Sequence, residues 1–138
     1  MDKGSYVLTF SLEYPTAVIV GKLGEHTFPP GRYAYVGSAL NGLEARVARH
    51  FSPDKRRRWH IDHLLAHAVD LRALLLRSGD RMECFLSRMV GHLPGSGKEM
   101  DGFGSSDCGC ETHLYHISFR DQEYLEAVFG PSNLVTGD

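Results

Sequence analysis

The stretch at residues 31–50 constrains the fold of this chain most, because a strand pattern, a glycine turn and a helix pattern follow one another within it. Arg32–Val36 alternates with a period of two, which places Tyr33 and Tyr35 on one face of a predicted strand. Gly42 then indicates a turn after this strand. We therefore expect a strand with two tyrosines on one face that turns directly into a helix.

The helix predicted after this turn covers Leu43–Phe51 and carries Arg46 and His50 one turn apart. Positions i and i+4 share a helix face, so a guanidinium group and an imidazole group can act on the same substrate group. In outline, this is an arrangement that binds phosphate.

The rest of the chain alternates between strand and helix patterns, which is typical of the mixed α/β (α+β) class. The further strands are predicted at 4–12, 17–20, 69–76 and 113–119, and the further helices at 59–68, 82–93 and 121–129. The strand at 17–20 belongs to a hairpin that leads into Arg32–Val36, and the apolar strand at 69–76 is expected to be buried and central. Asp121 is the predicted N-cap of the last helix.

Length and composition favour one ordinary globular domain over residues 1–138. The chain has 42% hydrophobic and 23% charged residues, which argues against disordered and fibrous classes. No apolar run approaches the ~20 residues of a membrane span, and the first residues do not resemble a signal peptide. Three cysteines, two of them separated by one glycine, give no disulfide framework. We expect a cytoplasmic protein without a membrane partner.

The charge is unevenly distributed, although the formal net charge is only -2. Six basic residues against one acid lie between Arg46 and Arg58, whereas residues 98–138 carry eight acids and two bases. Such a basic run is either an ordinary solvated loop or a contact for a nucleic-acid backbone, and its place directly after the Arg46 helix favours the second. The predicted nucleic-acid contacts are Arg49, Lys55, Arg56, Arg57 and Arg58.

Several short motifs together resemble one known superfamily. They are Gly4-Ser5-Tyr6, Tyr35-Val36-Gly37, Leu43-Glu44-Ala45-Arg46, His50 and Glu83. In this combination the chain resembles the GIY-YIG nuclease superfamily. More narrowly, the segments Pro30–Ala39, Trp59–Leu64, Glu83-Cys84 and Gly102–Leu114 resemble an uncharacterised branch that is sometimes fused to endonuclease III-type DNA glycosylases. The resemblance implies a small, mainly antiparallel sheet of three to five strands, flanked by helices.

The resemblance also implies a function, namely hydrolysis of DNA phosphodiester bonds in DNA repair or processing, with one Mg²⁺ or Mn²⁺ ion held by Glu83. Arg46 would stabilise the negative charge that develops on the phosphate. Tyr6 would lie next to the attacking water, with His50 accepting its proton, and Tyr35 would hold the phosphate. Tyrosine ionises near pH 10, so this role requires Arg46 and the metal to lower the pKa of Tyr6.

Four further residues are second-rank site candidates: His60, Asp62, Asp107 and His113. His60 and Asp62 belong to the branch motif and would orient a catalytic group. An asparagine that many members carry after the metal-binding helix has no counterpart, so Asp107 or His113 would replace it.

The run Cys108-x-Cys110-x-x-His113-x-x-His116 offers four zinc ligands, but on a strand the two histidines would point to opposite faces. We expect reduced cysteines rather than a structural zinc. Two alternatives to a nuclease stay open: a nucleic-acid-binding module that does not cleave, and a small metal-binding protein. The choice between DNA and RNA also stays open, because a basic loop contacts only the phosphates.

Overall fold

The computed structural model describes residues 3–39, 41–53, 59–105 and 108–137. Its strands are β1 (Gly4–Leu12), β2 (Thr16–Ile19), β3 (Glu25–Phe28), β4 (Gly31–Ala39), β5 (Val69–Arg77), β6 (Gly97–Lys98), β7 (Leu114–Ile117) and β8 (Leu134–Thr136). Its α-helices are α1 (Leu43–Phe51), α2 (His60–Leu65), α3 (Glu83–Gly91) and α4 (Phe119–Phe129), and its 3₁₀ turns are Gly21–Leu23 and Pro131–Asn133.

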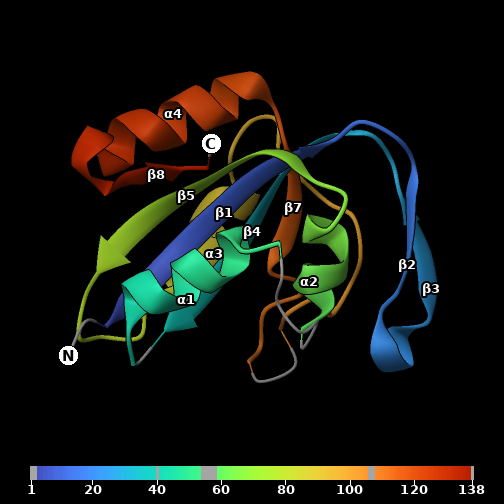
Figure 1. The fold of residues 1–138 in the computed structure, drawn as a ribbon, viewed down its shortest axis with the longest axis horizontal. Coiled ribbons are helices and arrows are strands. Elements are labelled where there is room, and N and C mark those ends of the chain that lie inside the picture. The colour runs from blue at the N-terminus through green and yellow to red at the C-terminus, as the bar shows by residue number, and fades with distance from the viewer. Residues whose placement is uncertain (1–2, 40, 54–58, 106–107, 138) are drawn as a thin grey trace.

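The described strands form one antiparallel sheet in the order β6-β7-β4-β1-β5-β8 and a separate hairpin of β2 and β3 (Figure 1). The mixed class is confirmed, and the hairpin lies before β4 as expected. The sheet has six strands rather than three to five, because β6 and β8 extend its two edges. With two and three residues, these strands are too short to show a period of two in the sequence.

Helices cover both faces of the sheet and divide the core in two (Figure 1). On one face, Leu43 and Val47 of α1 and Ile61 of α2 pack against the aromatic side of β1 and β4. On the other face, Leu86 of α3 and Leu125 of α4 pack against aliphatic residues of the same strands. Strand β5 lies between β1 and β8, so it is an inner strand, and β4 and β1 form the middle of the sheet.

The N-cap of the last helix lies three residues earlier than the sequence predicted. Ser118, not Asp121, is its N-cap, because the Ser118 hydroxyl accepts from the Asp121 N–H at 3.0 Å. The Asp121 carboxylate accepts in return from the Ser118 N–H at 3.0 Å, which completes a capping box. The predicted strand 113–119 is accordingly shortened to β7. Within the described residues, no helix is long and apolar enough to cross a membrane.

Candidate active site

A cleft of about 970 Å³ brings together side chains from segments that are far apart in the sequence. It is bordered by β1, β4 and α1, by the starts of α2 and α3, and by the loop at 102–104. Its lining includes the predicted site residues Tyr6, Tyr35, Arg46, His50, His60 and Glu83. A smaller hollow of about 490 Å³ beside α1 and α2 is lined by only two predicted site residues, His50 and Asp62. The larger cleft is therefore the candidate active site.

Tyr6 and His50 form a buried pair at the floor of this cleft. The Tyr6 hydroxyl oxygen lies 2.8 Å from Nε2 of His50, and both side chains are buried. Tyr6 faces Gly37 across the β1–β4 register. A Cβ atom at Gly37 would lie 2.5 Å from the Tyr6 ring and its hydroxyl oxygen, so this position must be glycine for the ring to pass over β4 and reach α1.

Burial decides the ionisation of both tyrosines in the cleft. It raises the pKa of Tyr6 to about 12, and the nearby Arg46 offsets this only in part. Burial also raises the pKa of Tyr35. Arg46 thus lowers the pKa of Tyr6, as expected from the sequence. In the protein without metal or substrate, however, burial raises this pKa by more than Arg46 lowers it. At neutral pH the Tyr6 phenol keeps its proton and can donate it in a hydrogen bond to His50.

Trp59 holds the two arginines of α1 in place. The guanidinium carbon of Arg46 lies 4.8 Å from the centre of a Trp59 ring, and that of Arg49 lies 4.2 Å away. Arg46 also donates to the Ser38 carbonyl oxygen at 3.1 Å. Arg46 therefore faces the cleft with its orientation fixed from two sides.

Asp62 does not line the cleft, but it contacts Trp59, which does. Its buried carboxylate accepts from Arg49 at 3.2 and 3.0 Å and from the Trp59 N–H at 2.9 Å. Arg49 thus pairs with Asp62 while its side chain stays 23% exposed, and its role as a nucleic-acid contact stays a prediction. His60, the neighbouring candidate, does line the cleft, and its Nε2 would lie 2.7 Å from a Cβ at Gly21.

Glu83 begins α3 and brings a carboxylate to the edge of the cleft. Its Oε1 accepts from the Ser38 hydroxyl at 2.6 Å, and its Oε2 lies 2.7 Å from Nδ1 of His113. Burial opposes ionisation, but His113 and Ser38 together lower the pKa of Glu83 below its usual value. The side chain is therefore an anion at neutral pH, as a ligand for a hard cation must be.

His113 and the three cysteines meet on the far side of Glu83. The ligand atoms of Cys84, Cys108, Cys110 and His113 all lie within 4.8 Å of one another. The sequence offered His116 as a possible zinc ligand, but strand alternation was expected to turn it away from His113, and its Nε2 does lie elsewhere, 2.8 Å from Glu99. Strand β7 begins at Leu114, so His113 precedes the strand instead of lying on it as predicted.

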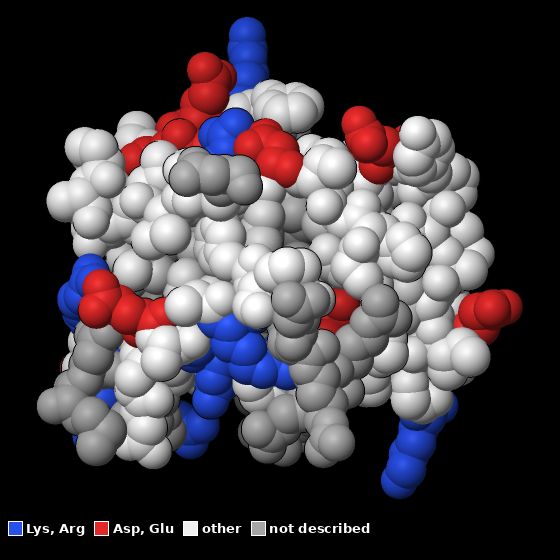
Figure 2. Space-filling view, in the orientation of Figure 1, with Lys and Arg blue, Asp and Glu red and all other residues white. Residues whose placement is uncertain are grey.

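Two sets of predicted residues lie outside the part of the chain that the structure describes: Asp107 and the run Lys55–Arg58. Conversely, the structure adds Ser38, Lys22 and Arg81 to the cleft lining. Nothing in the sequence patterns singled these out, because each reaches the cleft through the tertiary fold. Figure 2 shows basic side chains low in the middle of one face, in the region between α1 and α2 of Figure 1, and acidic ones mainly along the upper rim and the sides.

A comparison with protein families gives one finding. The model of a family described as domain of unknown function DUF123 matches residues 5–130, which include the whole cleft lining. No curated protein and no solved structure matches the chain.

Proposed function

The chain belongs to the DUF123 family, and we propose that it is a metal-dependent endonuclease of the GIY-YIG type that hydrolyses phosphodiester bonds in DNA. The observation that carries the proposal is the meeting of an ionised carboxylate, Glu83, with the Arg46 guanidinium and the Tyr6–His50 pair in one cleft. These are the groups that phosphodiester hydrolysis requires: a cation ligand, a donor for the phosphate and a route for the proton of water.

Arg46 is the group for the phosphate. Its guanidinium presents a planar fork of donors, which matches the oxygens of a phosphate better than a point charge does. The contacts with Trp59 and the Ser38 carbonyl limit its movement. A pre-oriented donor stabilises the charge that builds up in the transition state without first paying for its own ordering.

Tyr6 and His50 are the groups for the proton. A phenol whose pKa is raised to about 12 is a poor base on its own at neutral pH. His50 lies within hydrogen-bond distance of the phenol oxygen, so Tyr6 can give its own phenol proton to Nε2 of the imidazole as it accepts a proton from water. In this proposal Tyr6 orients the water and His50 is the final acceptor.

Glu83 is the residue that would hold Mg²⁺ or Mn²⁺, because the cleft offers its carboxylate as an oxygen ligand. The bound cation would polarise the phosphate and lower the pKa of its own water. The donor set fits such an ion, since Mg²⁺ is commonly bound by one or two carboxylates and keeps several waters. Each carboxylate oxygen has two lone pairs, so the contacts with Ser38 and His113 leave acceptor capacity on Glu83.

DNA is the proposed partner, and a functional link to DNA glycosylases follows from the branch resemblance. Lys22 and Arg81 add positive charge to the cleft lining. The basic run Lys55–Arg58 ends directly before Trp59, which also lines the cleft. A backbone of phosphates that enters the cleft would therefore meet the charges of Lys22 and Arg81.

A non-catalytic DNA-binding module is the second candidate, and one observation favours it. Both oxygens of Glu83 are already engaged, one by Ser38 and one by His113. If these contacts persist when DNA binds, the carboxylate orders the protein instead of a catalytic cation.

Nicking of supercoiled plasmid and of flap and branched DNA with Mg²⁺ or Mn²⁺ tests the proposal. We expect wild-type protein to nick, and Glu83→Gln and Arg46→Lys each to lose at least ~100-fold in rate, because each substitution removes a few kcal/mol of transition-state stabilisation. Glu44→Gln is the matched control, since Glu44 is an exposed carboxylate of α1 that pairs with Arg77 outside the cleft.

DNA binding is measured in parallel by a gel-shift assay in EDTA. Binding without nicking on any substrate, under every metal tried, would reject the endonuclease and leave the binding module. Equal nicking by Glu83→Gln and wild type would reject the assigned role of Glu83.

A further inference from the structure

We propose that Cys84, Cys108, Cys110 and His113 bind a structural Zn²⁺ ion beside the cleft. The four ligand atoms lie within 4.8 Å of one another, and Sγ of Cys108 lies 3.4 Å from Nε2 of His113. In a tetrahedral zinc site with bonds of about 2.0–2.3 Å, ligand atoms are roughly 3.3–3.8 Å apart. The set therefore needs to contract by no more than about 1 Å to close around the ion.

The chemistry of the donors selects the metal. Three sulfur atoms and one imidazole nitrogen form a soft set that suits Zn²⁺ and disfavours Mg²⁺ or Ca²⁺. Four protein ligands fill a tetrahedral shell, which is typical of a structural rather than a catalytic zinc. All three cysteines are free thiols in the structure, so none is withdrawn from the set by a disulfide.

The surroundings of His113 match those of a zinc ligand. Its imidazole is buried, with Nε2 toward Cys108 and Nδ1 at 2.7 Å from the Glu83 carboxylate. A ligating histidine almost always presents its second nitrogen to a carboxylate or a carbonyl, which fixes the tautomer and the ring orientation. Here Glu83 is in the position of that carboxylate.

The site would also explain how the connection between β6 and β7 is held. Residues 99–113 contain no helix or strand in their described part. Backbone bonds join the base of this connection, from the Gly102 N–H to Glu111 O at 2.6 Å and from the His113 N–H to Phe103 O at 2.8 Å. Zinc would join Cys108 and Cys110 of this connection to Cys84 in the first turn of α3, which also carries Glu83.

Glu83 would therefore contact both metal sites, as a ligand of the cleft cation and as the partner of the zinc-bound His113. Zinc binding itself does not require nuclease activity. Zinc would order His113, and His113 would hold one oxygen of Glu83 at the cleft. The zinc site can exist whether or not DNA is cleaved. Metal content and cleavage are measured separately, so the failure of one proposal does not imply the failure of the other.

Metal analysis of the untagged full chain, purified under reducing conditions without chelator, tests the site. We expect equimolar zinc, and we expect Co²⁺ exchanged into the protein to give the visible bands of a tetrahedral thiolate site. Cys84→Ser and Cys110→Ser should lower the zinc content to below about a tenth per chain, because each removes one of four ligands. His67→Gln is the control, an exposed histidine outside the set.

The wild-type measurements decide the matter even if a cysteine variant fails to fold. Protein without zinc that also fails to bind added Zn²⁺ after thiol reduction would overturn the proposal. Stoichiometric iron in place of zinc, or a disulfide among the three cysteines with no metal, would overturn it as well.

Discussion

Gly37 shows how a single residue controls the geometry of the candidate site. Its partner across the strands is Tyr6, and the Tyr6 ring occupies the space where a side chain would begin. The φ angle of Gly37 is not in the left-handed region, so the requirement for glycine here is steric and not conformational. The Tyr-x-Gly motif thus has a physical reason in this chain: the glycine makes room for the other tyrosine.

Gly37→Ala should therefore damage both stability and the Tyr6–His50 pair. The new Cβ would lie 2.5 Å from the Tyr6 ring, so the ring must move away from His50 or β4 must shift. We expect the free energy of unfolding to fall by about 1–3 kcal/mol, as for other overpacked core positions. Urea denaturation measures the loss, and the plasmid assay, run where the variant is folded, measures the effect on nicking.

Gly97→Ala is the matched control for this substitution. Gly97 is also a strand glycine, but a Cβ there would meet no atom within 4 Å among the described residues. We expect its stability to stay within about 0.5 kcal/mol of wild type. If Gly37→Ala is as stable and as active as Gly97→Ala, the proposed steric role of Gly37 is wrong.

Local sequence rules reached part of the site, because part of it is built from regular structure. A period of two placed Tyr35 on a strand, and a period of 3.6 placed Arg46 and His50 on one helix face. No such rule relates Cys84 to His113, since Cys84 lies in the first turn of a helix and His113 ends an irregular connection. Their meeting depends on tertiary packing, which explains why the sequence favoured unligated cysteines.

At the scale of elements, the short helix α2 depends on Asp62 for its start. Asp62 occupies the third helical position and accepts from the Trp59 N–H, while its other contacts hold Arg49. The side chain is fully buried, so its charge is stabilised by these partners and not by water. Trp59, in turn, lies against the guanidinium of Arg46. One carboxylate therefore links the start of α2 to the phosphate-binding group of α1.

Asp62→Asn should destabilise the protein by about 2–4 kcal/mol, because it removes the buried negative charge that accepts from Arg49 and from the Trp59 N–H. It should also lower nicking at saturating Mg²⁺, since Trp59 would no longer be fixed beneath Arg46. Thermal unfolding measures the first effect and the plasmid assay the second.

Asp101→Asn provides the comparison, because Asp101 pairs with Lys98 at the surface and its side chain is 79% exposed. Such a pair contributes about 0–1 kcal/mol. Equal melting temperatures for the two variants would contradict the structural role assigned to Asp62.

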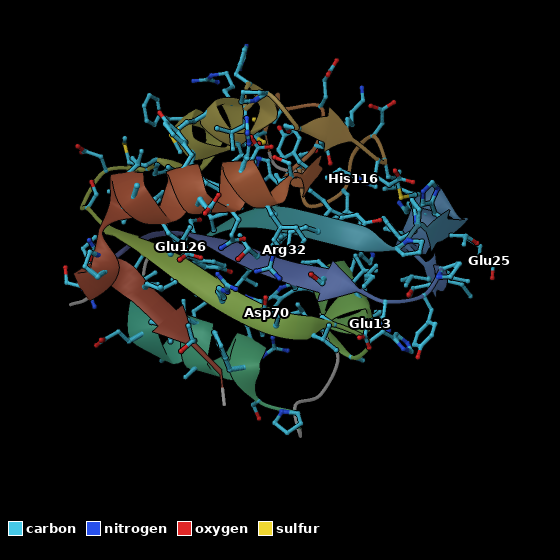
Figure 3. The ribbon with its side chains drawn as sticks, turned by 90° about the horizontal axis from the view of Figure 1, so that it is seen from above. Glu13, Glu25, Arg32, Asp70, His116 and Glu126 are labelled. Atoms are coloured by element: carbon cyan, nitrogen blue, oxygen red, sulfur yellow. The ribbon has the colours of Figure 1, made fainter. Side chains whose placement is uncertain are left out.

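At the scale of the whole molecule, Arg32 joins the sheet to the last helix. Its side chain is 1% exposed and donates to the Thr9 hydroxyl at 3.0 Å, to Gln122 of α4 at 3.0 Å and to the Asp70 carbonyl oxygen at 2.8 Å. Figure 3 shows Arg32 close to the labelled Asp70 of β5 and Glu126 of α4. The sequence did not predict this network, because its members lie on four elements and share no local pattern.

Acidic pH should weaken this network, because protonation removes the negative charge of the Asp70 carboxylate. A hydrogen bond from Arg72, together with the charge of Arg32, lowers the pKa of Asp70 below its usual value near 4. A lowered pKa in the folded state means that the carboxylate stabilises the protein at pH values above its unfolded pKa. That contribution is lost as the pH falls through about 4 towards the lower folded value.

Asp70→Asn tests this dependence without straining the backbone. Asp70 has a φ of 52°, and asparagine tolerates the left-handed region as well as aspartate does. We expect the variant to be less stable than wild type by about 1 kcal/mol at pH 7, a modest value because the Asp70 side chain is 46% exposed. The difference should persist down to about pH 5 and shrink towards zero near pH 2, as the wild-type carboxylate takes up its proton.

Urea unfolding at pH 7, 5, 4 and 3 measures this stability difference, with the exposed Asp80→Asn as control. A difference that stays constant from pH 7 to 3 would mean that the charge of Asp70 does not stabilise the buried Arg32.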